Sequence, residues 1–393
     1  MKAKSIKGKS PEEMKRALEQ SMADGFKPTL AIVFISIKQD RKAVCEIFHN
    51  EDIDILGATS SGEFVDGHQS QGEIAILLLD IHRDHYCILF EKTKGKDINQ
   101  AARKAATAAL SKFSRPGLIL CSTCLSNTGE TYDGRALIHG LETAFGKEVE
   151  IFGGMAGADG ALAGTQVFDT RHITDEGFAI LVLNTDKISM TGTAISGWKP
   201  LGRVRTATKC MDGWIYEIDG QPALEMYLRY LGQTLNSKNE SGQIFFMEDI
   251  GFFYPFLAID SGEPSLRTPM EVDKDRNAIK LNFAIPEGGQ FQFTLPPEFD
   301  IVESILNNAT EIKESQHTEA EALLVFSCLG RLSALGPMIE QENEGLHKIW
   351  KAPMAGFFTY GEYGKGLNDN HKFHSTTCSW VALKEKTKTE DNP

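Results

Sequence analysis

Apolar stretches of strand length alternate along the first part of the chain with stretches that have helical spacing. Residues 10–23 begin with Ser-Pro-Glu-Glu, an N-cap followed by proline, and we predict a helix there. Residues 29–36 (TLAIVFIS) are β-branched and apolar, as expected of a buried strand. A helix over 40–50 and a short strand over 53–56 follow, so the pattern predicts a mixture of helices and strands.

The middle of the chain predicts strands separated by two helices. Residues 73–79 and 86–90 are apolar and are joined by a polar turn, which predicts an antiparallel hairpin. The alanine-rich stretch 97–113 is the clearest helix in the sequence. The other predicted elements are a strand at 118–124, a helix at 132–145 and several strands between 165 and 217.

The chain changes character at Pro222, which opens an apolar helix that ends at Gly232. Residues 236–243 are polar and predict a loop. Residues 278–295 predict strands around a turn at 286–289 (Pro-Glu-Gly-Gly). The last predicted elements are helix, strand, helix and strand over 300–362, a strand over 375–383 and a charged, disordered tail from residue 384.

Two pairs of segments repeat within the chain. ILGATSSGEF (55–64) and MAGFFTYGEY (354–363) both end an apolar stretch in a polar Gly-Glu segment. LILCSTC (118–124) and LLVFSCL (323–329) both place a cysteine at the end of a predicted strand. We interpret this repetition as two related lobes with polar loops at equivalent strand ends, where ligands bind in open α/β sheets. Chance similarity between glycine-rich loops is the alternative.

Composition narrows the class of protein. The 393 residues are 41% hydrophobic and 24% charged, which is typical of a globular protein, and the net charge of −13 disfavours broad nucleic-acid binding. No apolar run reaches the ~20 residues of a membrane span, and the basic N-terminus lacks the apolar core of a signal peptide. Seven cysteines, most of them in apolar runs, indicate reduced thiols. We therefore expect a cytoplasmic protein that binds neither membrane nor nucleic acid.

Patterns typical of catalytic and metal sites are incomplete in this sequence. The C-x-x-C at 121–124 begins inside a predicted strand and has no second pair, which favours two buried thiols over a redox or zinc site. Two histidine pairs spaced i, i+3 lie in turn or strand context, where such residues face opposite sides. No nucleophile elbow, Walker A loop or dinucleotide fingerprint is present, so we do not expect an enzyme. An enzyme with Cys328 as nucleophile is the least favoured alternative, because it needs a base nearby.

Polar groups gather near predicted strand ends in the C-terminal part. The segments SCLGR (327–331), GFFTYGE (356–362) and HKFHSTT (371–377) supply a thiol, a guanidinium, a phenol, a carboxylate, imidazoles and hydroxyls. Such a mixture suits a small polar or zwitterionic ligand, with Arg331 binding a carboxylate and Glu362 an amine. The alternative is that Arg331 and Glu362 pair with each other and hold two loops together.

These motifs, taken together and in order, resemble those of the FIST family. ILGATSSGEF and IFGGMAGAD (151–159) are similar to segments of the FIST N domain, and YEIDGQPALEMYLRYLG (216–232) is similar to the junction into the FIST C domain. FSCLGR, GFFTYGEYG and FHSTT are similar to the closing motifs of the second domain. One departure is Ser375, which follows His374 where the family usually has asparagine. The implied division is an N-terminal helical extension (1–27), a FIST N domain (28–221), a FIST C domain (222–385) and a disordered tail (386–393).

The resemblance implies an α+β fold of two related lobes of mixed β-sheet with flanking helices. It also implies a sensory, ligand-binding role in signal transduction. FIST modules are often fused to kinases, cyclases or chemotaxis domains; since the match takes up this chain, we expect it to signal through a separate partner. The polar residues of the motifs are the candidate ligand-binding residues: Ser60, Ser61, Glu63, Arg331, Tyr360, Glu362 and Thr377.

A stand-alone bacterial subgroup of similar layout binds haem b, senses nitric oxide and regulates a histidine kinase. On this resemblance we expect a haem-dependent nitric-oxide sensor that acts on a partner histidine kinase. His374 is the first candidate for the axial ligand, and His139 and Cys328 are weaker ones. The second hypothesis is a sensor of a small metabolite such as an amino acid, without haem, that uses Arg331 and Glu362. A homo-oligomer is compatible with both hypotheses.

Overall fold

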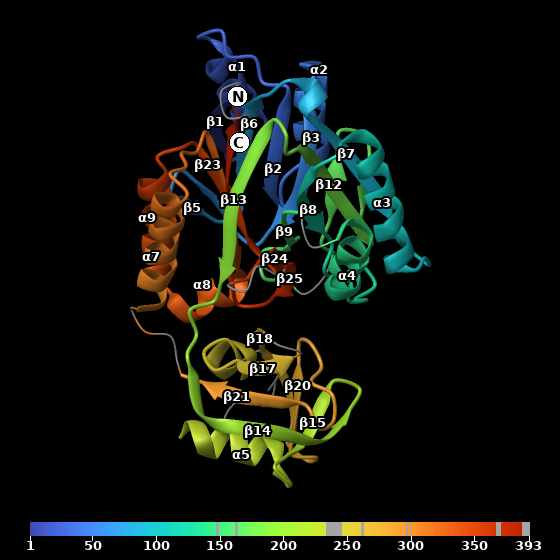
Figure 1. The fold of residues 1–393 in the computed structure, drawn as a ribbon, viewed down its shortest axis with the longest axis vertical. Helices are drawn as coiled ribbons and strands as arrows, with labels where there is room; N and C mark the ends of the chain where they lie inside the picture. Colours follow the sequence, from blue (N-terminus) through green and yellow to red (C-terminus); the bar gives the residue numbers. More distant parts are fainter. Residues whose placement is uncertain are drawn as a thin grey trace. The chain divides into compact units, whose positions relative to one another are not determined.

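Helices and mixed sheets fill the computed structural model, as the sequence pattern predicts, and they fall into two units (Figure 1). The structure describes residues 1–146, 149–161, 164–232, 246–260, 263–295, 298, 300–366 and 371–386. The first unit comprises Met1–Ile195, Val302–Leu329 and Pro337–Pro393, and the second comprises Ser196–Ile301 and Gly330–Gly336. None of the helices in these described ranges is both long enough and apolar enough to span a membrane.

Three six-stranded sheets of the same construction form the first unit. In each, two parallel strands lie at the centre, an antiparallel strand flanks each of them, and a further antiparallel strand forms each edge. Sheet A contains, in spatial order, β1 (Lys2–Gly8), β6 (Ile74–Asp80), β2 (Leu30–Ser36), β3 (Asp54–Ser60), β10 (Val167–Asp169) and β11 (Ile173–Thr174). Sheet B contains β13 (Ile188–Ile195), β26 (Cys378–Glu385), β22 (Ala322–Cys328), β23 (Met354–Thr359), β4 (Glu63–Val65) and β5 (His68–Ser70). Sheet C contains β25 (His371–His374), β24 (Glu362–Lys365), β9 (Ile151–Met155), β8 (Pro116–Ser122), β12 (Gly177–Asn184) and β7 (Tyr86–Lys92).

The order of elements along the chain shows that the first unit is a threefold repeat. Each repeat runs strand, helix, strand, helix and then four strands: from β1 to β6, from β7 to β12, and from β13 to β26. In the third repeat the two segments of the second unit are inserted, one after β13 and one, which contains most of α8, after β22. In each repeat one hairpin belongs to the sheet of another repeat. The hairpin β4–β5 joins sheet B through β23, β10–β11 joins sheet A through β3, and β24–β25 joins sheet C through β9. The pairs of similar segments in the sequence are therefore copies from three repeats. The helices of the repeats are α1 (Pro11–Met22), α2 (Arg41–Asn50), α3 (Ile98–Lys112), α4 (Gly134–Phe145), α7 (Asp300–Ser315) and α9 (Met338–Trp350), whereas α8 (Leu329–Leu335) lies almost entirely in the second unit.

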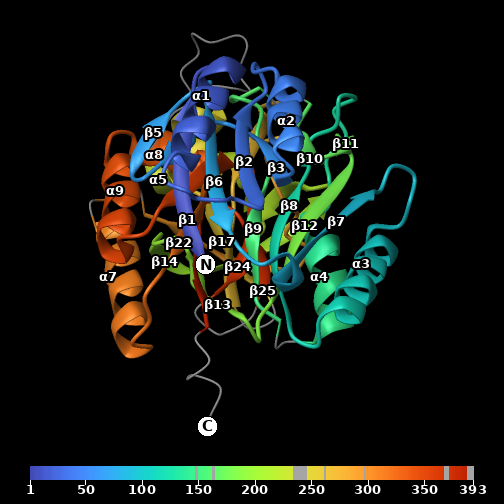
Figure 2. The same cartoon turned by 90° about the horizontal axis from the view of Figure 1, so that it is seen from above.

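Alternating side chains of the strands build two kinds of core. In β2, Leu30, Ile32 and Phe34 belong to a cluster that collects residues from all three sheets. The ring of Phe34 lies 4.5 Å from the ring of Phe357 and 6.0 Å from that of Phe326, both of sheet B. The intervening residues of β2 pack in a separate cluster with residues of α1 and α2. The sheets thus share an inner core, and the helices cover their outer faces (Figure 2).

The helix starts follow the predicted capping chemistry. The Ser10 hydroxyl accepts a hydrogen bond from the backbone N–H of Glu13, with Pro11 at the first helical position of α1. Asp40 caps α2 in the same way, at 3.0 Å from the backbone nitrogen of Ala43. These caps satisfy N–H groups that an α-helix leaves unpaired, so the predicted helix starts are confirmed.

The predicted hairpin of 73–79 with 86–90 is wrong. The first stretch is β6, which pairs with β1 and β2 of sheet A, and the second is β7, which pairs with β12 of sheet C. A 3₁₀ turn at Arg83–His85 carries the chain from one sheet to the other. A continuous apolar strand such as β6 is buried on both faces and needs a partner on each side. The second partner is β1, which lies within residues 1–27, where we expected only a helix.

The second unit contains an eight-stranded sheet whose described strand pairs are all antiparallel, and α5 (Ala223–Leu231) packs with it. The predicted helix end is confirmed, because Gly232 takes a left-handed conformation with φ of 65°. The predicted turn at 286–289 is confirmed by the hydrogen bond from Gly289 N to Pro286 O, at 2.8 Å. The predicted loop at 236–243 lies outside the described residues. The disordered tail predicted from residue 384 is wrong at its start, because β26 continues to Glu385 and the N–H of Lys386 donates to Lys187 O at 2.7 Å; residues 387–393 lie outside the described residues. The strands are β14 (Pro200–Met211), β15 (Trp214–Ile218), β16 (Gln221–Pro222), β17 (Phe256–Asp260), β18 (Glu263–Arg267), β19 (Pro269–Asp273), β20 (Ala278–Leu281) and β21 (Gln290–Thr294), and a π-helical turn spans Met247–Gly251.

Candidate functional site

The chain segments that follow β3, β9 and β23 meet at one place in the first unit. The backbone N–H of Ser61 donates to Phe358 O at 3.1 Å, which joins the first segment to the third. The N–H of Gly157 donates to Thr59 O at 2.8 Å, and that of Met155 donates to Gly361 O at 2.7 Å. We call this meeting point the junction, and the three segments (59–63, 155–166 and 358–362) its corners. The carboxyl ends of the three parallel strand pairs therefore share one location, where ligands bind in many α/β sheets.

A glycine facing an aromatic ring fixes the correspondence between the corners. Phe64 pairs in register with Gly356, Phe168 with Gly57 and Tyr363 with Gly153. A Cβ added at Gly57 would stand 2.2 Å from the ring of Phe168, and one at Gly356 would stand 2.1 Å from the ring of Phe64. The residue before each aromatic ring is consequently equivalent in the three repeats. These residues are Glu63, Val167 and Glu362, so two corners carry a carboxylate and the third does not.

The two glutamates hold their corners by the same pair of hydrogen bonds. Glu63 accepts from the Ser60 hydroxyl and, at 3.0 Å, from the backbone N–H of Glu73. Glu362 accepts from the Thr359 hydroxyl at 2.5 Å and from the backbone N–H of Thr377 at 3.1 Å.

Glu73 and Thr377 directly precede β6 and β26, the strands by which the chain returns to its own sheet. Each glutamate therefore ties the departing strand to the returning one. Both side chains are fully buried, and burial raises the pKa of Glu63 to about 7. The nearby carboxylates of Asp159 and Glu73 raise this pKa further, and the two hydrogen bonds oppose the rise.

The third corner has a longer connection and a different acid. Asp159 has a left-handed backbone, with φ of 51°, and its Oδ2 accepts from the Ser36 hydroxyl at 2.6 Å. Lys38 Nζ lies 3.6 Å from the same oxygen. The Asp159 side chain is only 2% exposed, and its Oδ1 is buried without a hydrogen-bond partner among the described residues. A buried carboxylate oxygen that lacks a partner is costly, so this oxygen is a candidate to receive a donor from a ligand.

A cavity of about 220 Å³ opens beside this third corner. It lies at the carboxyl ends of β2 and β3, against the first turn of α2, where N–H groups and the helix dipole favour an anion. The guanidinium of Arg41 stands over the ring of Phe168, 5.4 Å from its centroid. Gln166 immediately precedes the valine that replaces the glutamate, and its backbone N–H donates to the Thr59 hydroxyl at 2.9 Å. The cavity is lined by Ser36, Ile37, Gln39, Asp40, Arg41, Lys42, Thr59 and Gln166.

The structure gathers most of the residues that the motifs singled out. All of those in the first unit lie at the junction, and they are Ser60, Ser61, Glu63, Tyr360, Glu362 and Thr377. Except for Tyr360, which is half-buried and donates to Ala161 O at 2.6 Å, they are buried. They hydrogen-bond to one another, to the Thr359 hydroxyl and to the backbone, which gives them a positioning role. Sequence reasoning did not single out Ser36, Arg41, Asp159 or Gln166, although Asp159 lies in the quoted segment IFGGMAGAD.

Arg331 belongs to the second unit, whereas Glu362 belongs to the first. Arg331 is fully buried, donates to Ser196 O at 2.5 Å and lies over the ring of Trp198, 5.5 Å from its centroid. The joint role of Arg331 and Glu362 stays a prediction.

The residues named for haem lie in three separate settings. His374 is on β25, and its Nε2 lies 3.1 Å from Gly364 O; because a carbonyl only accepts, this nitrogen carries the proton in that hydrogen bond. His139 is exposed on α4, and Cys328 is buried at the end of β22. Within the described ranges no group of three His, Cys, Asp or Glu side chains is arranged to hold a metal ion. All seven cysteines are free thiols, and burial raises the pKa of both Cys121 and Cys124 to about 12.

Comparison with known proteins identifies the family. A search of curated proteins found no match. The family model of the FIST N domain matches residues 29–221, and that of the FIST C domain matches residues 223–365. The boundary between the two models falls within the second compact unit, so the family division and the compact units cut the chain differently. FIST domains are associated with ligand binding in sensory signal transduction, and the chain belongs to the FIST family.

Proposed function

We propose that this protein is a sensor of a small zwitterionic metabolite, such as an amino acid, which binds in the cavity at the third corner. One observation carries the proposal: the cavity is lined by Gln166, next to the valine that replaces the buried glutamate, and by Ser36, whose hydroxyl donates to Asp159, an acid with an oxygen that has no partner among the described residues. Its volume of about 220 Å³ is below the ~300–1,000 Å³ that is common for larger organic ligands. A small ligand is therefore favoured.

The lining offers opposite charges to the two ends of such a ligand. Arg41 and Lys42 form the first turn of α2 and suit a carboxylate. Asp40 also lines the cavity, and Asp159 accepts a hydrogen bond from the Ser36 hydroxyl of the lining, so acids that suit an ammonium group are close by. The amide of Gln39 is held by Gly72 O at 2.7 Å, which keeps this wall ordered.

Titration calorimetry with the individual amino acids tests this proposal on the full chain. We expect at least one to bind, and we expect Arg41→Gln to weaken its binding about tenfold through loss of a charge-assisted hydrogen bond. Because Arg41 also contacts Phe168, Lys42→Gln is a second variant that leaves the core untouched. Arg103→Gln, on the exposed face of α3, is the matched control. Absence of binding for every amino acid, or equal binding by all variants, would overturn the proposal.

A separate signalling partner, predicted as a histidine kinase, would read out the bound state. The direct measurement is autophosphorylation of a candidate kinase, with and without this protein and its ligand. A ligand-dependent change that Arg41→Gln abolishes would support the proposed partner. A rate that is the same under all conditions would remove that kinase from consideration.

The haem-dependent nitric-oxide sensor rests on the family resemblance alone. His374 does not line the cavity at the third corner, and we derive no step through haem. An absorption spectrum of protein made with ample haem tests this hypothesis. A stoichiometric Soret band that shifts with nitric oxide and weakens in His374→Ala would support it, with His139→Ala as the comparison. A flat spectrum would exclude it.

A further inference from the structure

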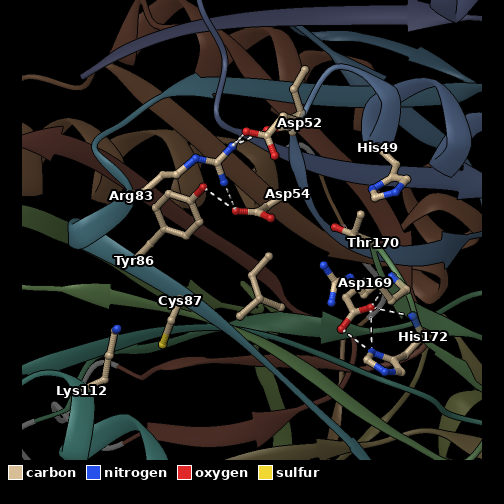
Figure 3. Close-up of a pocket in the computed structure, with 13 residues that line it drawn as sticks. His49, Asp52, Asp54, Arg83, Tyr86, Cys87, Lys112, Asp169, Thr170 and His172 are labelled. Atoms are coloured by element: carbon tan, nitrogen blue, oxygen red, sulfur yellow. Dashed lines mark hydrogen bonds and ion pairs between the residues drawn. The ribbon is translucent and has the colours of Figure 1, made fainter.

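A second and larger cavity lies at the other end of β3, far along the strand from Thr59. Its volume is about 440 Å³, and it opens between sheet A and β7, the edge strand of sheet C (Figure 3). Asp54, the first residue of β3, lines one side, and the turn after β10 lines another. No residue is shared between this cavity and the one at the third corner.

All three carboxylates that line the larger cavity contact a basic side chain. Arg83 lies 2.7 Å from Asp54 Oδ2 and 3.0 Å from Asp52 Oδ2. The Tyr86 hydroxyl also donates to Asp54, at 2.8 Å. On the opposite wall, His172 Nδ1 lies 3.0 Å from Asp169 Oδ2, and Figure 3 shows the two groups of contacts facing each other.

Two permanent cations remain without an acid. Lys112 ends α3, and Arg171 lies between β10 and β11; among the described residues neither makes an ion pair. Figure 3 places Lys112 beside Cys87, across the cavity from His172. The cavity therefore presents unpaired positive charge from two different elements.

The equivalent position in another repeat, next to β9 and the hairpin β24–β25, shows which group binds the corresponding basic residue. Counting back from the glycines of the junction, Asp54 corresponds to Glu150, and the hairpin registers make Arg171 correspond to His371. In that other groove Glu150 lies 3.3 Å from His371 Nε2 and 3.2 Å from Lys365 Nζ. An internal carboxylate thus occupies that groove.

In the larger cavity the corresponding carboxylate is held elsewhere. Arg83 and Tyr86 bind Asp54 on the side of β7, so it does not pair with Arg171. This cavity therefore has the basic residue, Arg171, that corresponds to His371, but among the described residues no carboxylate pairs with it as Glu150 pairs with His371.

We propose that this cavity is a second ligand site, and that it takes a small organic anion whose carboxylate plays the part of Glu150 in the equivalent groove. Arg171 binds that carboxylate, and Lys112 favours a second negative group at the other end of the ligand. The site is a small dicarboxylate site, and it does not depend on the function proposed for the third corner.

Calorimetry on the full chain with succinate, citrate, acetate and inorganic phosphate tests the proposal. We expect succinate or citrate to bind more tightly than acetate. Arg171→Gln is expected to raise the dissociation constant about tenfold, and Lys112→Gln is expected to weaken the dicarboxylate more than acetate. Both side chains are exposed, so these variants keep the fold, which their thermal midpoints check.

Two controls separate this site from the first one. Arg103→Gln removes an exposed cation elsewhere, and Arg41→Gln alters the cavity at the third corner; both are expected to bind the dicarboxylate as the unmodified protein does. Binding lost in Arg41→Gln but kept in Arg171→Gln would overturn the assignment. So would binding of phosphate alone, or no binding of any probe at millimolar concentration.

Discussion

Two corners of the junction are closed by a buried glutamate, and the third is open beside a cavity. Glu63 and Glu362 make the same two hydrogen bonds from equivalent places, whereas Val167 occupies that place in the third corner. The longer connection there brings in Asp159 instead. Two copies of the repeat thus use this position to hold the scaffold together, and the copy without the glutamate lies beside the cavity that we propose as the ligand site.

Removing a glutamate from one of the two closed corners is expected to change the free energy of unfolding most. Glu362→Ala leaves a void and two donors without an acceptor, so we expect a loss of about 3 kcal/mol in the free energy of unfolding. Val167→Ala at the third corner loses packing only, about 1.5 kcal/mol. Urea unfolding at pH 6 measures both. Equal losses of unfolding free energy in the two variants would mean that the hydrogen bonds of Glu362 do not hold the departing and returning strands together.

The second prediction concerns pH and Glu63. Its ordinary pKa of 4.5 is raised to about 7 in the folded protein, chiefly by burial. The folded state therefore keeps a proton that the unfolded chain releases above pH 4.5. Stability is fully present at low pH and falls by up to about 3 kcal/mol as the pH rises from about 4.5 through 7.

Glu63→Gln should remove this part of the pH dependence, because glutamine stays neutral. Its oxygen can accept from the backbone N–H of Glu73, and its NH2 group can donate to the Ser60 hydroxyl. Stability curves at a series of pH values, compared with the exposed control Glu19→Gln, provide the measurement. If Glu63→Gln and the unmodified protein have parallel pH profiles, the folded-state pKa of Glu63 is close to its ordinary value.

The third prediction tests the glycine contacts that define the corners. The three atoms nearest to an alanine Cβ at Gly57 all belong to the ring of Phe168, the first at 2.2 Å, so Gly57→Ala should cost about 2 kcal/mol, and most of this cost should vanish with Phe168→Leu. At Gly356 the backbone oxygen of Val325 is also in the way, at 2.2 Å. The cost of Gly356→Ala should therefore persist when Phe64 is leucine. Thermal unfolding of the two double-mutant cycles measures these costs. If leucine at the ring position restores stability in both cycles, the contact with the backbone oxygen does not determine the cost at Gly356.

The smallest effect on stability is expected at the open corner. Asp159→Asn keeps an acceptor for the Ser36 hydroxyl and removes a charge that has no partner on one oxygen, so stability should change by less than about 1 kcal/mol. Amino-acid binding, in contrast, should weaken about tenfold if that oxygen receives the ammonium group. Calorimetry and unfolding on the same sample separate the two effects. Unchanged binding would place the ammonium group elsewhere in the cavity.

Local pattern was sufficient for the elements with strong periodicity or clear caps. The helix that begins at Pro11, the strand that ends at Ser36 and the helix that Gly232 ends were all predicted from short-range chemistry. Strand β1 was missed, because four of its seven residues are lysine or glycine and only Ile6 of the strand is a strongly apolar residue. Its role depends on β6, which lies about seventy residues further along the chain.

Strand partners and the third repeat could not be predicted for a related reason. The hairpin prediction failed because apolar character says that β6 and β7 are strands and not which strands they pair with. The third copy of the motif escaped notice since it lacks the Gly-Glu segment, and the second unit interrupts another copy. Likewise, Arg41 and Gln166 lie far apart in sequence and meet only when β10 joins sheet A.

The exchange of hairpins between the sheets has a consequence for how the chain acquires its structure. Sheet B receives β4 from the first repeat, and Asp66, just after β4, accepts a hydrogen bond from a residue 288 positions later. During synthesis from the N-terminus, the edge of the hairpin β4–β5 that pairs with β23 stays unpaired until almost the entire chain has been made. Contacts so distant in sequence make folding slow, and unpaired strand edges favour aggregation. We therefore expect the yield of native protein to depend on translation speed and on chaperones far more than its final stability would suggest.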